Sequence, residues 1–117
     1  MVSGHRLKSL PPLLVRLTFL LLWILAGSGT LASAATHEVF IENMSFKPAE
    51  LEVSRGDTVT WINKDFVPHN ATAEGGVFRS PDLELDQTWS YRAEQVGEFA
   101  YYCSLHPTMR ANLIVVK

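Results

Sequence analysis

Cysteine is nearly absent from this sequence: Cys103 is the only one among 117 residues. One cysteine cannot form a disulfide within its own chain, so the fold must be stable without that crosslink. Cys103 is therefore a buried free thiol, an intermolecular link or a metal ligand. The chain beyond residue 34 also lacks any sustained helical period of apolar residues, which favours an all-β domain.

The first 34 residues lack acidic side chains altogether. Their only charges are Arg6, Lys8 and Arg16. A basic start is followed by an apolar run from Leu17 to Ala26, broken only by Thr18, and then by the small residues of Ala32-Ser33-Ala34. This order predicts a secretory signal peptide over residues 1–34, cleaved after Ala34.

An uncleaved leader is the alternative, because the apolar stretch from Leu10 to Ala26 approaches the length of a membrane span if Arg16 is tolerated. In that case the leader would be the only contact with a membrane. Either way, the sequence predicts one small domain over residues 35–117, exported to the periplasm or a comparable compartment.

The predicted mature chain is acidic. All 12 Asp and Glu follow residue 34, together with seven of the 10 Lys and Arg, which gives a net charge of seven minus 12, or minus five. This balance argues against nucleic acid as a partner. We interpret the charges as the solvated surface of a small exported domain, which we expect to be a monomer.

Alternating apolar residues predict about seven short strands after the leader. The expected strands are His37–Glu42, Ala49–Val53, Thr58–Asn63, Ala71–Ala73, Gln87–Arg92, Glu98–Tyr102 and Asn112–Lys117. We expect Phe46–Pro48 to be a bend, because Pro lacks a ladder donor, and both Leu83 and Leu85 to pack on the core. Turn spacing then favours a two-sheet Greek-key β-sandwich of seven to eight strands.

Three soft donors follow one another at three-residue intervals near the C-terminus: Cys103, His106 and Met109. Two histidines, one cysteine and a weak axial methionine form the ligand set of a blue-copper electron-transfer site. Zinc is the first competitor, but zinc sites built on cysteine use Cys and His and rarely Met. The pattern therefore favours copper.

The stretch from Tyr102 to Arg110, with Leu113 to Val116 after it, resembles the copper loop and last strand of cupredoxins, the plastocyanin and pseudoazurin family of type 1 copper proteins. Its short Cys-x-x-His-x-x-Met spacing is similar to that of amicyanins. A second stretch, Gly56 to Asp65 followed by Pro68-His69-Asn70, resembles the cupredoxin segment that ends in the first histidine ligand. The resemblance covers Val39 to Lys117.

The resemblance implies one copper ion held by His69, Cys103, His106 and Met109. In amicyanins the histidine that matches His106 is the solvent-edge ligand and electron port, and it can protonate and leave the metal on reduction. The residue that matches Asn70 ties the ligand loops together. The resemblance therefore implies that Asn70 and Ser104 support the ligands by hydrogen bonds without binding the metal themselves. Pro107 is expected to stiffen the loop.

The resulting hypothesis is an exported carrier that shuttles single electrons between redox proteins, for which the resemblance suggests a dehydrogenase and a cytochrome. It is not expected to be an enzyme, because protein donors fill every position around the metal. The rival hypothesis is a periplasmic protein that stores or delivers copper with the same ligands. His37 would be the third residue of a chain that starts at Ala35, where it could help bind Cu(II), but a chance histidine is the simpler interpretation.

Overall fold

The computed structural model describes Gly4 and residues Ser33 to Lys117. The chain divides into two units, residues 1–32 and residues 33–117. The strands that the structure describes lie in the second unit. The predicted signal peptide therefore lies almost entirely outside the described residues, and its cleavage remains a prediction. Within the described part of the chain, no helix has the length and apolar character needed to cross a membrane.

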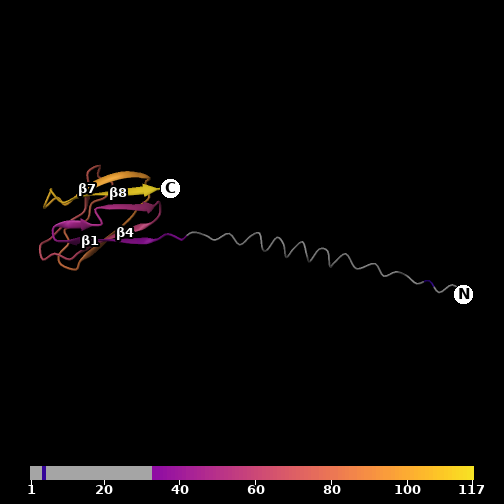
Figure 1. Cartoon of the computed structure of the whole chain (residues 1–117), viewed down its shortest axis with the longest axis horizontal. Helices are drawn as coiled ribbons and strands as arrows, with labels where there is room; N and C mark the ends of the chain where they lie inside the picture. The colour runs from indigo at the N-terminus through magenta and orange to yellow at the C-terminus, as the bar shows by residue number, and fades with distance from the viewer. Residues whose placement is uncertain (1–3, 5–32) are drawn as a thin grey trace. The chain divides into compact units, whose positions relative to one another are not determined.

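Residues 33–117 form eight strands in two four-stranded sheets (Figure 1). The strands are β1 (Thr36–Glu42), β2 (Ser45–Lys47), β3 (Glu50–Ser54), β4 (Thr58–Asn63), β5 (Thr72–Ala73), β6 (Thr88–Arg92), β7 (Gly97–Tyr102) and β8 (Arg110–Val116). One sheet has the order β2-β1-β4-β6 and the other β3-β8-β7-β5. The predicted all-β, two-sheet sandwich is confirmed, and both sheets are mixed because β1 pairs with β4, and β3 with β8, in parallel.

Alternating side chains explain which face of each strand is buried. In β4, Val59 and Trp61 are buried, while the alternate residues Thr58, Thr60 and Ile62 are only partly covered. In β8, Leu113 and Val115 point the same way and are also buried. An aromatic cluster fills the space between the sheets, with the Trp61 and Tyr101 rings packed edge to face at 5.6 Å between centroids. A period of two with one apolar face is the pattern that a sandwich core requires.

Phe46 departs from the predicted bend. It lies in β2, pairs with Ile41 of β1 and is buried. The turn that makes this possible is formed by Asn43 and Met44, both of which have positive φ angles of 52° and 58°. Two consecutive left-handed residues form the tight hairpin turn that matches strand twist, so the chain reverses before Phe46 rather than at it.

The two leucines near residue 84 have different environments. Leu83 is buried, as predicted, because it exchanges backbone hydrogen bonds with His69: the His69 N–H donates to Leu83 O at 3.1 Å and the Leu83 N–H to His69 O at 2.7 Å. Leu85 is 40% exposed, so its predicted place in the core is wrong. It lies in the turn before β6, where the Gln87 N–H donates to Glu84 O and turns the chain away from the core.

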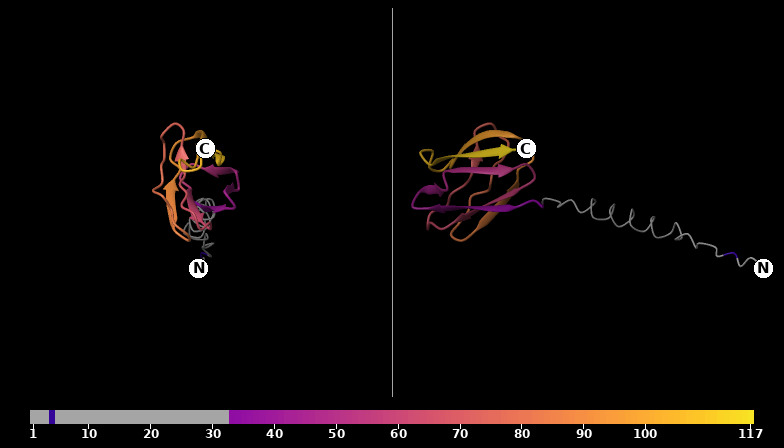
Figure 2. Two further views of the ribbon diagram at one scale, coloured as in Figure 1. Left: turned by 90° about the vertical axis from the view of Figure 1, so that its left-hand side faces the viewer. Right: turned by 45° about the vertical axis from the view of Figure 1, so that its right-hand side comes forward.

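The loop between β7 and β8 lies at one end of the sandwich and the C-terminus at the other, as the views of Figures 1 and 2 agree. The β4–β5 loop lies at the same end as the β7–β8 loop. This follows from the contact between the Asn70 N–H and the sulfur of Cys103. Residues that are 33 positions apart are thus neighbours at the end of the sandwich that carries the candidate site.

Candidate metal centre

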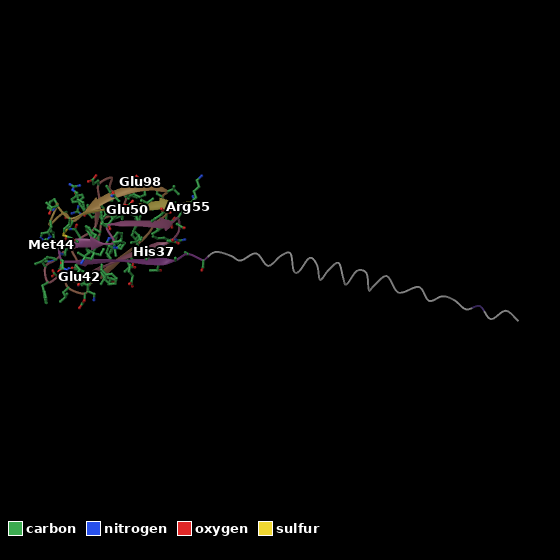
Figure 3. The ribbon with its side chains drawn as sticks, viewed as in Figure 1. His37, Glu42, Met44, Glu50, Arg55 and Glu98 are labelled. Carbon is green, nitrogen blue, oxygen red and sulfur yellow. The ribbon has the colours of Figure 1, made fainter. Side chains whose placement is uncertain are left out.

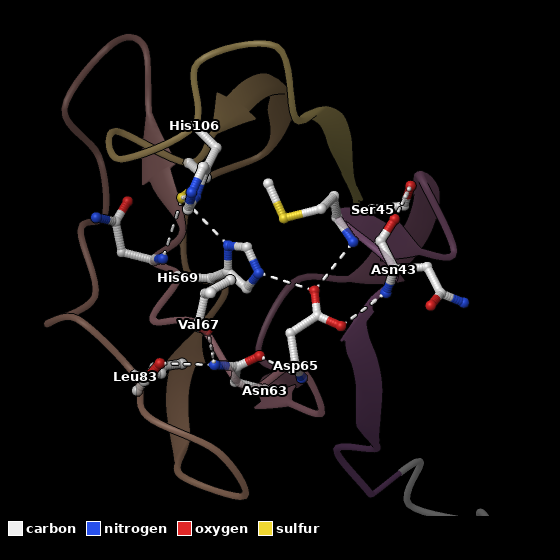
Figure 4. A network of polar contacts seen from close by, with 11 residues as sticks. Asn43, Ser45, Asn63, Asp65, Val67, His69, Leu83 and His106 are labelled. Atoms are coloured by element: carbon white, nitrogen blue, oxygen red, sulfur yellow. Dashed lines mark hydrogen bonds and ion pairs between the residues drawn. The ribbon is translucent and has the colours of Figure 1, made fainter.

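Three of the predicted donors converge on one point. The sulfur of Cys103 lies 3.8 Å from Nδ1 of His69 and 3.7 Å from Nδ1 of His106 (Figure 4). The three donor atoms all lie within 4.8 Å of one another. A metal ion bonded at about 2.3 Å to sulfur and about 2.0 Å to nitrogen, at a trigonal angle, separates the two donors by about 3.7 Å. The donor set therefore has the dimensions of a trigonal His₂Cys site.

Hydrogen bonds within the β7–β8 loop bring Met109 back to Cys103. The His106 N–H donates to Cys103 O, the Met109 N–H to His106 O, and the Cys103 N–H to Met109 O, at 3.2, 2.9 and 3.1 Å. Each three-residue step of the sequence is thus closed by a backbone bond. The Met109 side chain is buried in this loop, where a flexible thioether can approach the metal as a weak ligand.

His69 is fully buried and is held on both sides. Its backbone pairs with Leu83, and its Nε2 lies 2.8 Å from Oδ2 of Asp65. Burial raises the pKa of Asp65, but the N–H of Met44, the imidazole of His69 and the N–H of Asn43 outweigh it and leave this pKa below its ordinary value. Ionised Asp65 can only accept hydrogen bonds, so Nε2 of His69 is the donor in this contact, and Nδ1 is the ring nitrogen that faces Cys103.

Asn70 connects the two ligand loops through its side chain and its backbone. Its Nδ2 donates to Ser104 Oγ at 2.6 Å and to Asp82 Oδ1 at 2.9 Å, and its Oδ1 accepts from the Ser104 N–H and the Thr72 hydroxyl, both at 2.9 Å. Its backbone N–H lies 3.4 Å from the sulfur of Cys103. The network therefore fixes the position of the Cys103 sulfur relative to both ligand loops.

Both ligand loops carry exposed apolar side chains. His106 is half-buried, and its neighbours Leu105 and Pro107 are exposed. In the β4–β5 loop, Phe66 is 89% exposed and Val67 is exposed as well. The Asn70 to Ser104 bonds hold the two loops together, so the exposed apolar residues and His106 share one end of the domain.

Sequence reasoning selected His69, Cys103, His106, Met109, Asn70, Ser104 and Pro107, and missed Asp65. A carboxylate four residues before a histidine in a loop also occurs as an ordinary turn residue. Its role became visible only through its contact with His69.

His37 lies at the opposite end of β1 from the site, as Figure 3 shows by the positions of His37 and Met44. Its Nε2 is 2.9 Å from Oδ2 of Asp57, and the Ala35 N–H donates to Oδ1 of the same carboxylate at 2.9 Å. This carboxylate gives His37 a partner within the domain, in accord with the interpretation that needs no second copper site.

The fold and the converging donors define a class of small β-sandwich metal protein, and comparison with known families agrees. The sequence model of the Cupredoxin-like domain matches residues 15–115. The chain belongs to the cupredoxin-like family, and its donors fit the copper ion that such proteins bind.

Several individual relatives of this chain are amicyanins. Amicyanin from Paracoccus denitrificans is 37% identical over 82 residues, which cover 66% of this chain and 63% of that protein. Amicyanin-alpha from Methylorubrum extorquens is 33% identical over 89 residues, covering 72% of this chain and 75% of that protein. A solved Cu(I) form of an amicyanin variant superposes with a TM-score of 0.65 at 36% identity, over 73% of this chain and 85% of that one. The chain thus spans 63% of the first of these relatives.

Proposed function

We propose that this protein is an exported carrier of single electrons that holds one copper ion through His69, Cys103, His106 and Met109. The observation that carries the proposal is the convergence of the thiol and two imidazole nitrogens at separations of 3.7 and 3.8 Å. Copper bound there would supply a one-electron Cu(I)/Cu(II) couple. Soft sulfur with imidazole favours copper over the zinc alternative.

The surroundings of the donors suit electron transfer rather than catalysis. Cys103 and His69 are completely buried, and Met109 is nearly so, which leaves the half-buried His106 as the ligand nearest to solvent. With four protein donors, the site keeps no position for a substrate. The Asn70 bonds hold both ligand loops in place, and a rigid ligand set reduces the rearrangement that accompanies each change of oxidation state.

Electrons would enter and leave through His106. The exposed apolar residues of the two ligand loops, including Leu105 and Phe66, offer a surface from which a protein partner can displace water. By analogy with the amicyanins, we propose a dehydrogenase as donor and a cytochrome as acceptor. The proposal includes cleavage after Ala34, which would release residues 35–117 into the periplasm.

The test is to add Cu(II) to the purified protein and record visible absorption and EPR spectra, beside the variants Cys103→Ser and His37→Asn. We expect an intense blue thiolate-to-copper band with narrow copper hyperfine splitting, which Cys103→Ser abolishes and His37→Asn retains. A colourless protein with an ordinary tetragonal Cu(II) spectrum would refute the site.

A second measurement separates the carrier from a copper-delivery protein. A carrier should show a reversible potential with fast electron self-exchange and should retain its copper when it is mixed with a metal-free acceptor. Rapid transfer of copper to that acceptor would instead support delivery.

A further inference from the structure

Asp65 joins the predicted ligand His69 to a hairpin turn that contains no predicted ligand. Its Oδ2 lies 2.8 Å from Nε2 of His69, its Oδ1 accepts from the Asn43 N–H at 2.8 Å, and its Oδ2 accepts from the Met44 N–H at 2.9 Å (Figure 4). Its own N–H donates to Oδ1 of Asn63 at 2.9 Å. Both oxygens and the backbone of Asp65 are therefore fixed.

The turn is shaped to hold this carboxylate. Asn43 and Met44 both have left-handed backbones, and two successive N–H groups in such a turn point to the same side, where they form a concave site for an anion. Asn tolerates this conformation, but Met adopts it rarely. The hydrogen bonds from both N–H groups to Asp65 help to explain why Met44 adopts the left-handed conformation in this turn.

His69 depends on Asp65 for its orientation. The imidazole is fully buried, so an unpartnered Nε2–H would be costly. An ionised carboxylate accepts and does not donate, which places the proton on Nε2 and directs the Nδ1 lone pair toward Cys103. A carboxylate on the far side of a ligand imidazole also adds negative charge close to the metal.

We propose that Asp65 is a positioning residue: it links the β1–β2 turn to His69, fixes the Nε2–H tautomer of that imidazole, and lowers the reduction potential of the copper site by its negative charge. The part of the proposal on the tautomer concerns the metal-free protein. The part on the reduction potential rests on the proposed copper function. The two parts are therefore tested separately.

The metal-free test uses long-range ¹H–¹⁵N NMR of the imidazoles at pH 7, with the variants Asp65→Asn and Asp86→Asn. Asp86 is an exposed carboxylate paired with Lys64 at 2.8 Å, so its variant loses the same charge without touching His69. We expect wild type and Asp86→Asn to show a single Nε2–H tautomer at His69. The Asn43 and Met44 amide signals should shift in Asp65→Asn only. An Nδ1–H tautomer in the wild type, or unchanged amide signals in Asp65→Asn, would overturn the proposal.

The copper test measures reduction potentials by protein-film voltammetry. Loss of the charge should favour Cu(I) over Cu(II) about tenfold in Asp65→Asn, which raises the potential by about 59 mV for one electron. Asp86→Asn should change it by less than half as much. Asp65→Glu keeps the charge and should stay near the wild-type potential. Equal potentials in Asp65→Asn and Asp86→Asn would refute the electrostatic part.

Failure of the proposed function would look different. If even the wild type binds no blue copper, the function is refuted, while the NMR measurement still decides whether Asp65 fixes the tautomer. If Asp65→Asn does not fold, Asp65→Glu carries the test. In a folded Asp65→Glu variant, an Nε2–H tautomer at His69 and Asn43 and Met44 amide signals like those of the wild type would support the proposal. An Nδ1–H tautomer in that variant would overturn it.

Discussion

Replacement of Asn70 by Ala tests whether the polar network between the two ligand loops stabilises the domain. The side chain is 1% exposed and makes four hydrogen bonds, two of them to Ser104 in the other ligand loop. Alanine removes all four but keeps the backbone N–H that points at Cys103. The variant therefore isolates the side-chain bonds from the contact with sulfur.

The four bonds set the size of the effect. At about 1 kcal/mol net for each bond, their sum is about 4 kcal/mol. Asp82 is exposed and Thr72 half-buried, so both can regain bonds to water, whereas the Ser104 N–H loses its only protein partner at a partly buried position. We therefore expect Asn70→Ala to lower the free energy of unfolding by about 2–4 kcal/mol, a large part of the roughly 5–15 kcal/mol typical of a small domain.

The assay is urea unfolding of the metal-free protein at pH 7, followed by far-UV circular dichroism. Asn112→Ala is the matched control, because Asn112 is exposed on β8 and should change stability by less than about 0.5 kcal/mol. The midpoint of Asn70→Ala should fall while the m-value stays constant. An Asn70→Ala variant as stable as Asn112→Ala would refute the network argument.

Two further predictions concern the metal and acid stability. Met109→Gln should retain copper and lower the reduction potential by about 59 mV or more, a tenfold change in relative affinity, because a harder oxygen donor favours Cu(II); an unchanged potential in voltammetry would argue against axial ligation. The N–H of Ala35, then His37 and the N–H of Ser54, lower the pKa of Asp57 from 3.8 to about 2. This depressed pKa adds stability above pH about 4, and it should be lost as the pH falls toward 2. Urea midpoints at pH 5, 3.5 and 2.5 should therefore fall more steeply in the wild type than in Asp57→Asn, and parallel curves would contradict this origin.

The local pattern of the sequence predicted seven of the eight strands that the structure describes and three of the four proposed ligands. Alternation over Thr58–Asn63 predicted β4 with its correct bounds, because a strand buries every second side chain and the sequence therefore alternates between two kinds of residue. The intervals between Cys103, His106 and Met109 likewise reflect successive turns of one short loop, closed by local backbone bonds. The resemblance to cupredoxins supplied His69 as a candidate.

Only the tertiary structure decided how distant residues meet. His69 and Cys103 are 34 positions apart, and the pairing of β5 with β7 brings their loops together. The turn at Asn43 and Met44 placed Phe46 in a strand with its side chain buried. The turn before β6 left Leu85 exposed despite its hydrophobicity. The role of Asp65 depends on a hairpin turn more than twenty residues earlier. A polar residue in a loop looks the same in sequence whether it faces water or a buried imidazole, because its partner is chosen by the fold and not by its neighbours in the chain.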